Sequence, residues 1–286
     1  MKYFIIAGEK SGDLHGSNLI RELHRTDPDA RIFCWGGDLM ENAGSRLLMH
    51  YRNTSFMGFV SVIRNLPVIA RNFNVCKKQI WDIKPDVVIL IDYPGFNLRI
   101  ARFAKEAGYR VFYYISPKLW AWREGRVKII RKYVDRMYII FPFEVEFYRK
   151  HGIEAHYFGN PLMDEIERRA SIIDREEIRG SIPGLDKRPV IALLAGSRKN
   201  EVEHVLPQML GIVKHFPDYQ FVIAGVSTLP ESLYSDITGS VPVRFVTDRT
   251  YEVLSISTAA LVTSGTATIE TALMNVPQVV CFKGDF

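Results

Sequence analysis

The sequence predicts an α/β fold made of two Rossmann-like domains. Short apolar runs alternate with helical patterns from one end of the chain to the other. The runs are almost continuously hydrophobic, which is typical of parallel strands covered by helices on both faces. A charged, turn-rich segment from about Asp164 to Arg188 divides the runs into two series. A length of 286 residues also suits two domains of moderate size better than one.

The predicted strands form one series on each side of this segment. The first series is Tyr3–Ala7, Arg31–Trp35, Asp86–Ile91, Arg110–Ile115, Arg136–Phe141 and Ala155–Phe158. The second series is Val190–Ala195, Gln220–Ala224, Val243–Val246, Ala260–Thr263 and Gln278–Phe282. We expect an N-terminal domain over residues 1–165 and a C-terminal domain over residues 166–286, facing each other across a cleft. Ligands of such folds bind where the strands end, so the turns after the strands are the candidate sites.

The composition and charge indicate which partners the protein suits and exclude some classes of protein. The net charge of +5 and the pI near 9.0 suit anionic partners such as nucleotides, acidic lipid surfaces or nucleic acid. No apolar run is long enough to cross a membrane, and the five-residue run at the N-terminus is too short for a signal peptide. The cysteines Cys34, Cys76 and Cys281 lack C-x-x-C spacing, which argues against zinc and disulfides and suits a reducing cytoplasm.

The first predicted strand runs into a glycine-rich turn, Ala7 to Asp13, and then into a helix that reaches Arg25. The turn lacks the G-x-G-x-x-G spacing of dinucleotide sites. We expect Ser11 or Asp13 to cap the helix. Glu9 stands at the tip of the strand, where a carboxylate would face the cleft, and is a candidate functional residue. The Gly36-Gly37 turn after the second strand could line the cleft or be purely structural.

Residues 57–80 predict a basic amphipathic helix. Apolar residues recur at helical spacing at Val60, Ile63, Leu66, Ile69, Phe73 and Cys76. The charged residues of this segment are all basic, and Pro67 is expected to kink or split the helix. Such a helix usually packs on a sheet, but a basic one can also lie on an anionic membrane or grip an acyl chain. The additional apolar residues Phe56, Phe59 and Val62 favour the lipid-facing interpretation.

Asp92 follows the most apolar strand of the first series directly. A carboxylate in this place is partly desolvated and points toward the ligand edge of the sheet, which suits a general base. We expect Asn97 to cap the next helix, and Asp86, at the other end of the strand, to be a strand-start or turn residue. Trp120 and Trp122 suit carbohydrate or acyl recognition or simple burial, and the turns Pro142–Glu144 and Gly159–Pro161 could be cleft turns or helix caps.

Two turns of the second domain predict an anion site. Arg198 follows Gly196 and Ser197 after the first strand of this domain, and a guanidinium binds diphosphate in a fork. Ser264, Gly265 and Thr266 link another strand to a helix over Thr266–Asn275, whose free N–H groups favour a phosphate. The Thr268 hydroxyl would add a donor, and Glu270 could accept from the hydroxyls of a ribose. No Walker A sequence competes with this interpretation, and no D-x-D or HEXXH-type cluster suggests a metal, so we predict no metal and no cofactor.

Taken together, these motifs closely resemble those of the lipid-A-disaccharide synthase family, glycosyltransferases of the GT-B fold. The resemblance covers nearly the whole chain through AGEKSGD, GGDLMENAG, MGFVSV, IDYPGFN, YISPKLWAWR, PFE, GNP, AGSR and SGTATIE. It implies an inverting transfer of 2,3-diacylglucosamine from UDP-2,3-diacylglucosamine to 2,3-diacylglucosamine 1-phosphate, giving a β-1′,6 disaccharide and UDP. It also implies a peripheral protein on the anionic inner face of the bacterial inner membrane, and no nucleic-acid partner.

The resemblance also assigns roles to residues. Asp92 matches the catalytic base for the acceptor 6-hydroxyl. Glu9, Ser11 and Gly12 match the active-site motif at the first turn, with Glu9 expected to be catalytic and Ser11 and Gly12 expected to bind substrate. The UDP-site motifs fall on Ser197, Arg198, Ser264, Gly265, Thr266 and Glu270. The membrane-associating patch of the family falls on Val60, Val62, Ile63, Leu66 and Ile69. The resemblance therefore implies that the N-terminal domain faces the acceptor and the membrane and that the C-terminal domain binds the UDP-sugar.

This chain departs from the family pattern at three places. Gly95 stands where some members carry a second aspartate, and Ala195 replaces a usual proline. The family is also roughly a hundred residues longer, so we expect a second domain truncated at its C-terminus. Two other functions stay open on the sequence: another UDP-sugar enzyme of the same fold, such as a 2-epimerase or an N-acetylglucosaminyltransferase, and a nucleotide-binding protein without catalysis.

Overall fold

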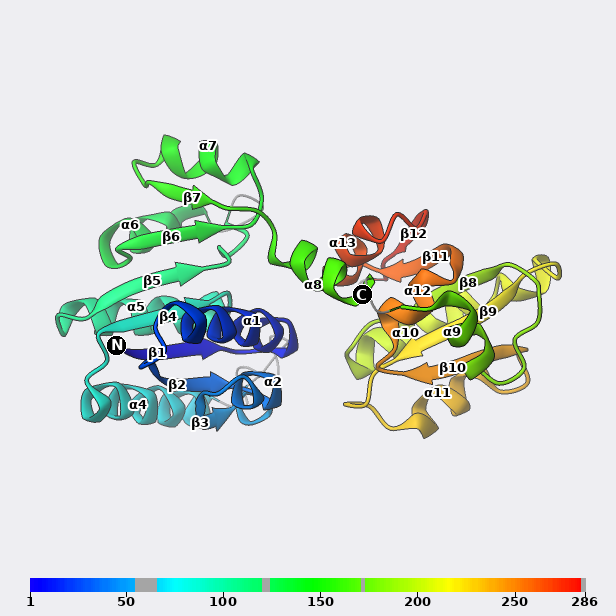
Figure 1. The fold of residues 1–286 in the computed structure, drawn as a ribbon, viewed down its shortest axis with the longest axis horizontal. Helices are drawn as coiled ribbons and strands as arrows, with labels where there is room; N and C mark the ends of the chain where they lie inside the picture. Colours follow the sequence, from blue (N-terminus) through cyan, green and yellow to red (C-terminus); the bar gives the residue numbers. More distant parts are fainter. Residues whose placement is uncertain (55–65, 120–123, 171–172, 284–286) are drawn as a thin grey trace. The chain divides into compact units, whose positions relative to one another are not determined.

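The computed structural model describes residues 1–54, 66–119, 124–170 and 173–283. The chain divides into two compact units, Met1–Pro161 and Leu162–Phe286, each built around one parallel sheet (Figure 1). This is the predicted α/β class with two Rossmann-like domains. The division of substrates between the two halves stays a prediction.

The first unit holds a seven-stranded sheet in the order β3-β2-β1-β4-β5-β6-β7. Its strands are β1 (Lys2–Ala7), β2 (Arg31–Gly36), β3 (Arg46–His50), β4 (Val87–Ile91), β5 (Arg110–Tyr114), β6 (Arg136–Ile139) and β7 (Ala155–Tyr157). Its helices are α1 (Lys10–Thr26), α2 (Asp38–Asn42), α4 (Leu66–Ile83), α5 (Pro94–Glu106), α6 (Val127–Tyr133) and α7 (Phe143–Lys150). The strand order reverses between β1 and β4, and this switch point is the ligand edge of an open α/β sheet.

Alternation along the central strands builds a core on each face of this sheet. Phe4 and Ile6 of β1 point to the face covered by α4, α5, α6 and α7, where the buried set includes Cys76, Ile80, Ile100, Ile130 and Tyr148. Ile5 and Ala7 point to the opposite face, toward Ile20 of α1 and Met40 of α2. Helices therefore shield both faces of the sheet from solvent, which explains why β1 and β4 have almost no polar residues.

The second unit holds a five-stranded parallel sheet in the order β10-β9-β8-β11-β12. Its strands are β8 (Val190–Leu194), β9 (Gln220–Gly225), β10 (Val243–Thr247), β11 (Ser257–Thr263) and β12 (Gln278–Cys281). Its helices are α8 (Pro161–Ala170), α9 (Arg175–Ser181), α10 (Lys199–Leu210), α11 (Glu231–Thr238), α12 (Thr250–Ser255) and α13 (Thr266–Leu273). Leu193 faces the core under α10, while Ala192 and Leu194 face the core under α9 and α12. The order reverses between β8 and β11.

Each predicted strand is present with slightly shifted ends, but the prediction missed β3 and the short helix α2. β3 lies at the edge of the sheet, and its side chains are exposed or only partly buried. It therefore lacks the continuous apolar run that marks the central strands. The Gly36-Gly37 turn leads into α2.

The predicted cap by Ser11 or Asp13 is wrong. Glu9 occupies the cap position of α1, and Ser11 donates its hydroxyl to the Glu9 carboxylate. Asp13 is buried and accepts from the backbone N–H groups of Gly37, Leu39 and Met40. Its carboxylate thus stabilises the start of α2. A buried carboxylate that accepts several backbone N–H groups at the start of α2 contributes more stability than it would as an exposed cap of α1.

The expected cap by Asn97 is also wrong. Tyr93 precedes α5 in the left-handed conformation, and Asn97 lies inside the first turn. Its side-chain amide is buried and donates to the carbonyl oxygens of Ile91 and Asp92. Asn97 therefore fastens the end of β4 to α5.

Within the described ranges, α4 begins at Leu66, and Pro67 is its second residue, so the predicted kink or split at Pro67 lies at the edge of the described residues. Cys76 and Ile80 of α4 are fully buried, and Ile69 is partly buried. No helix among the described residues has the length and apolar character needed to cross a membrane.

Candidate functional site

The switch point of the first unit brings two predicted carboxylates to one edge of the sheet. Ala7 of β1 pairs with Ile91 of β4, and Glu9 and Asp92 follow these two residues closely. Lys118, in the turn after β5, and Glu144, in the first turn of α7 after β6, both act electrostatically on Asp92. The predicted pair of Asp92 and Glu9 therefore forms part of a cluster drawn from four parallel strands.

The backbone at Asp92 is held in an unusual conformation. Asp92 and Tyr93 have positive φ values of 43° and 48°, and Ile115, after the neighbouring strand, has 64°. Such values are costly for residues other than glycine and persist where the surroundings fix them. Here the carbonyl oxygen of Asp92 accepts from the Asn97 amide at 2.8 Å and from the Tyr113 hydroxyl at 2.6 Å. These buried donors fix the turn that aims the carboxylate.

Gly8 also shapes this turn. A Cβ atom on Gly8 would lie 2.2 Å from Cγ of Tyr93, so the Tyr93 ring occupies the space that any larger residue would need. The Tyr93 hydroxyl donates to the carbonyl oxygen of Thr54 at 2.8 Å. Gly8 therefore belongs to the site through packing. Gly12 is likewise buried in α1, where an added Cβ would lie 3.1 Å from that of Ala7. Its predicted contact with substrate stays a prediction.

The electrostatics give Asp92 the properties of a general base. The pKa of its carboxyl is raised to about 7, first by burial and next by the Glu9 carboxylate. Lys118 and the backbone N–H of Tyr93 oppose the shift, and Glu144 adds to it. A base with a pKa near the working pH combines a sizeable ionised fraction with useful basicity. A carboxyl with such a pKa suits proton transfer, and the predicted role of Asp92 as a base stays a prediction.

Glu144 is a member of the cluster that sequence reasoning did not single out. It is 1% exposed, accepts a short hydrogen bond from the Ser116 hydroxyl and accepts at 3.2 Å from the N–H of Phe141. It thereby links the ends of β5 and β6. The sequence left the Pro142–Glu144 turn open, because only the sheet order reveals that Ser116 lies opposite. Trp120 and Trp122, in the same region of the sequence, lie outside the described residues.

The switch point of the second unit brings the two predicted anion-binding turns together. Leu194 of β8 pairs with Val262 of β11, so the turns after these strands share one edge. Gly196 has φ +110°, and a Cβ there would lie 2.5 Å from an oxygen of Glu201. Glu201 accepts from the backbone N–H groups of Ser197 and Arg198 and from the Arg198 guanidinium at 2.7 Å. The Arg198 side chain is 51% exposed and pre-oriented by this carboxylate.

The turn before α13 presents Ser264, Gly265 and Thr266 to solvent. Thr268 does not add the expected donor, because its hydroxyl donates to the carbonyl oxygen of Gly265 at 2.7 Å. Glu270, one turn further on, accepts from the Tyr251 hydroxyl at 2.6 Å. The exposed turn and the fixed carboxylate offer donors to a diphosphate and an acceptor to a sugar.

The predicted membrane patch is only partly described. Val60, Val62 and Ile63 lie outside the described residues, and Leu66 is the first residue of α4. Ile69 lies in the first turns of α4 and is partly buried. Val68, beside it, is 41% exposed.

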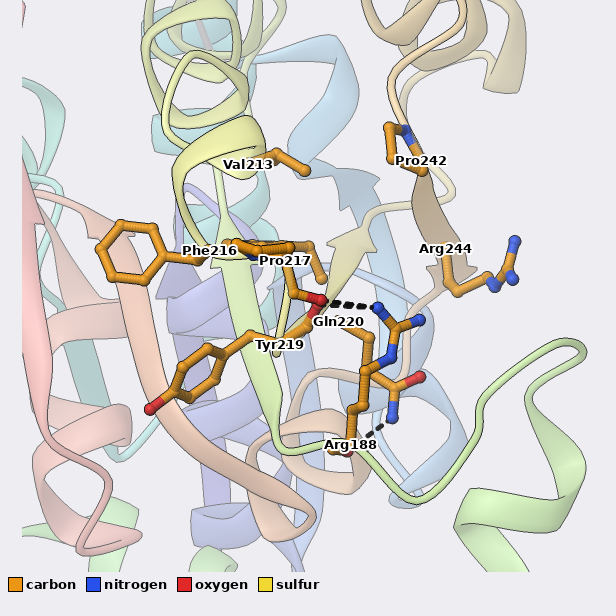
Figure 2. Close-up of a pocket in the computed structure, with 9 residues that line it drawn as sticks. Arg188, Val213, Phe216, Pro217, Tyr219, Gln220, Pro242 and Arg244 are labelled. Atoms are coloured by element: carbon orange, nitrogen blue, oxygen red, sulfur yellow. Dashed lines mark hydrogen bonds between the residues drawn. The ribbon is translucent and has the colours of Figure 1, made fainter.

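Two hollows lie away from these predicted residues. A small cavity of about 100 Å³ opens where the strands of the second unit begin (Figure 2). Its Arg188 guanidinium donates to the carbonyl oxygens of Pro217 and Tyr219, and Arg244 donates to that of Gly184, so both cations stabilise loops. The other hollow, of about 520 Å³ in the first unit, is lined by Lys128, Arg131, Lys150 and His151 with two glycines and a valine. In the described part of the chain, no group of three or more His, Cys, Asp or Glu residues could hold a metal ion.

Comparisons with known proteins agree with the motifs. The family described as lipid-A-disaccharide synthetase matches residues 3–285. A lipid-A-disaccharide synthase of Geobacter sulfurreducens is 40% identical over 289 aligned residues, which cover 99% of this chain and 74% of the relative. One from Coxiella burnetii is 35% identical, with 98% of this chain and 74% of the relative covered.

Solved structures with a similar fold include UDP-GlcNAc 2-epimerases. The enzyme of Neisseria meningitidis bound to UDP-GlcNAc gives a TM-score of 0.73 at 15% identity, over 98% of this chain and 82% of that chain. The enzyme of Methanocaldococcus jannaschii in complex with UDP-GlcNAc and UDP gives 0.69 at 15% identity, over 98% and 83%. At such identities the likeness concerns the fold alone, and it supports the GT-B class.

Proposed function

The chain belongs to the lipid-A-disaccharide synthase family of glycosyltransferases, and on this premise we propose that it moves 2,3-diacylglucosamine from UDP-2,3-diacylglucosamine to 2,3-diacylglucosamine 1-phosphate. The products are the β-1′,6 disaccharide 1-phosphate and UDP. The observation that carries the proposal is the partly buried Asp92 carboxyl, with its pKa of about 7, near Glu9 at the switch point of the first sheet.

In the proposed reaction Asp92 accepts the proton of the acceptor 6-hydroxyl. The freed oxygen attacks the anomeric carbon of the donor sugar and forms the new C–O bond while the bond from that carbon to the phosphate oxygen breaks. The electron pair of the broken bond leaves with UDP, and the attack from the opposite side inverts the anomeric centre. Glu9, held by the Ser11 hydroxyl, adds to the effect of burial in raising the pKa of Asp92, and it would bind an acceptor hydroxyl.

The second unit would hold the nucleotide. The exposed Ser264–Thr266 turn, at the start of α13, offers N–H groups and hydroxyls to the diphosphate, and Arg198 offers a planar fork. Negative charge grows on the β-phosphate as the sugar leaves, so fixed positive groups stabilise the transition state more than the ground state. Glu270 would accept from the ribose hydroxyls. This mechanism needs no metal ion.

A product assay tests the proposed function. We expect the protein to release UDP from UDP-2,3-diacylglucosamine only when 2,3-diacylglucosamine 1-phosphate is present, with a disaccharide 1-phosphate as the second product in mass spectrometry. UDP-N-acetylglucosamine replaces the acylated donor in the control reaction and should react far more slowly. Conversion of UDP-N-acetylglucosamine to its 2-epimer would instead establish an epimerase, and binding of UDP without turnover of either donor would establish a binding protein.

We further propose that the first unit docks on an anionic membrane through residues 57–69. The support is the acid-free, basic sequence of 57–80 together with the exposed Val68 and Arg71 at the start of α4. A basic amphipathic segment binds such a surface by apolar burial plus attraction to lipid phosphates. On this proposal the protein would lie peripherally on the inner face of the membrane, with its acylated substrates.

Vesicle binding tests the docking surface. Replacing Val62 and Ile63 together with serine should weaken binding to phosphatidylglycerol-containing vesicles about tenfold, because two apolar side chains no longer enter the interface. Flotation through a density gradient measures the bound fraction. Val145→Ser, at a 38% exposed position on α7, serves as the matched control and should bind as the parent does. Equal binding by all three proteins would place the membrane contact elsewhere.

A further inference from the structure

Glu270, the residue assigned to the ribose, is the end of a connected set of polar side chains in the second unit. The Tyr251 hydroxyl donates to its Oε1 atom at 2.6 Å. The guanidinium carbon of Arg169 lies 4.9 Å from the centre of the Tyr251 ring. Arg169 in turn donates to Glu165 at 2.5 Å, and Arg168 donates to both oxygens of the same carboxylate at 2.7 and 2.8 Å.

This set is built into the protein and is not a chance surface contact. Tyr251 is 7% exposed and Glu165 is 1% exposed, although Glu165 carries a charge. A carboxylate is buried only when its charge is compensated, and the two arginines supply that compensation. The set joins three helices that are separate in sequence: α8, α12 and α13. Nothing in the spacing of the sequence points to Tyr251.

We propose that Tyr251 is a positioning residue that fixes the Glu270 carboxylate for the two hydroxyl groups of a nucleotide ribose. This inference rests on the proposed function, because it assumes that a UDP-sugar binds at α13. A glutamate side chain has three rotatable bonds and must lose their freedom when it binds a ligand. A hydrogen bond that already holds one carboxylate oxygen removes much of that cost before the nucleotide arrives.

The chemistry of the contact suits this role. A carboxylate has about four acceptor positions, so one of its oxygens can accept from Tyr251 and from a ligand hydroxyl at the same time. Burial, followed by the Glu270 carboxylate, raises the pKa of the Tyr251 hydroxyl, so the phenol stays protonated and donating at any working pH. The Arg169 cation over the ring draws electron density from the phenol and strengthens it as a donor. Glu165 and Arg169 are the other charged groups that act on Tyr251.

The test compares two nucleotides by calorimetry. Tyr251→Phe keeps the ring, its packing and its contact with Arg169, and removes only the hydroxyl. We expect this variant to bind UDP about tenfold more weakly, because a hydrogen bond to a charged group is lost from the preformed site. Its affinity for 2′,3′-dideoxy-UDP, which lacks both ribose hydroxyls, should equal that of the parent. A loss confined to UDP separates positioning of Glu270 from general damage to the fold.

Two further variants sharpen the result. Tyr234→Phe is the matched control, because Tyr234 is also buried in the second unit, but its hydroxyl accepts from the Val226 N–H and lies in another helix, α11. It should bind both nucleotides as the parent does. Arg169→Gln leaves the Tyr251 hydroxyl in place and removes the cation above the ring, and a smaller loss confined to UDP is expected. If Tyr251→Phe does not fold, the affinities of Arg169→Gln for the two nucleotides test the proposal instead.

The outcomes distinguish this inference from the proposed function. If the parent binds neither nucleotide, the nucleotide site at α13 is wrong. If the parent prefers UDP and Tyr251→Phe keeps the full preference, the positioning role of Tyr251 is overturned. An equal loss for both nucleotides would overturn it as well, since a merely structural tyrosine would produce that result.

Discussion

Replacing Asp92 with asparagine is expected to lower the turnover number by about 10²–10⁴-fold, the usual contribution of a general base. Asparagine has nearly the same shape but cannot accept the proton of the acceptor hydroxyl. The affinity for UDP should not change, because the UDP site is assigned to the second unit. Single-turnover release of UDP measures the chemical step, and calorimetry measures the affinity.

The pH dependence gives the same prediction an independent readout. A base acts only when it is ionised, so the activity of the parent should fall about tenfold per pH unit below a pH of about 7, the pKa of Asp92. The residual activity of Asp92→Asn should lack this slope. Persistence of the slope in the variant would mean that another group is the base.

The same pKa predicts that the variant is at least as stable as the parent. The folded pKa of about 7 lies above the ordinary value of 3.8, so the folded state holds the proton more tightly than the unfolded chain. Ionisation of Asp92 therefore costs stability as the pH rises between these two values. Asp92→Asn removes this cost, and its melting temperature should exceed that of the parent at pH 8. An inactive but more stable variant cannot owe its inactivity to unfolding.

Asp86 provides a control on the same strand. It lies just before β4, at the opposite edge of the sheet, and its carboxylate accepts from the backbone N–H of Lys2 at 2.7 Å. Asp86→Asn retains an oxygen for that N–H, so turnover should stay within about twofold of the parent, as for substitutions outside a catalytic site. A similar loss of turnover in Asp86→Asn and Asp92→Asn would contradict the proposed role of Asp92 as the general base.

The sequence was sufficient for features that depend on local pattern. Continuous apolar runs located the central strands β1, β4, β8 and β11. Parallel strands end at the same edge, so placing Asp92 and Glu9 there needed only the strand assignment and the polarity of the following turn.

What the sequence could not provide are partners distant along the chain. Asp13 was expected to cap its own helix, yet it holds the start of α2. Glu144 could be paired with Ser116 only once β5 and β6 were known to be neighbours. Tyr251 gives no local signal, because a tyrosine in a short helix is usually a packing residue. Side-chain function depended on sheet order in each case, and sheet order is set by the whole unit.

Both units have a point at which the strand order reverses, and this point links the fold to the proposed chemistry. In the first sheet the order reverses between β1 and β4, and in the second between β8 and β11. The helices that follow such a pair of strands diverge to opposite faces, which leaves the turns at the strand ends accessible. The carboxylates of the first unit suit proton transfer, whereas the cation and helix start of the second suit a diphosphate. A glycosyltransferase needs one site of each kind.

Replacing Arg198 with alanine should therefore remove the charge that assists departure of UDP. We expect turnover to fall by about 10²–10³-fold, as when one transition-state donor is lost. Arg198→Lys should restore little, because an ammonium group cannot present the planar fork. The start of α10 should remain intact, since Glu201 keeps its bonds to the backbone N–H groups of Ser197 and residue 198.

Lys199→Ala is the matched control for this variant. Lys199 is the next residue, 66% exposed, and its ammonium lies 3.6 Å from the Glu203 carboxylate. Its removal changes the local charge equally but should leave turnover nearly unchanged. Arg198→Ala should also weaken UDP binding more than UMP binding, because UMP lacks the β-phosphate on which the leaving-group charge develops. If the two nucleotides lost affinity equally, or if Lys199→Ala were as damaging, Arg198 would act through general attraction of anions and not through the leaving phosphate.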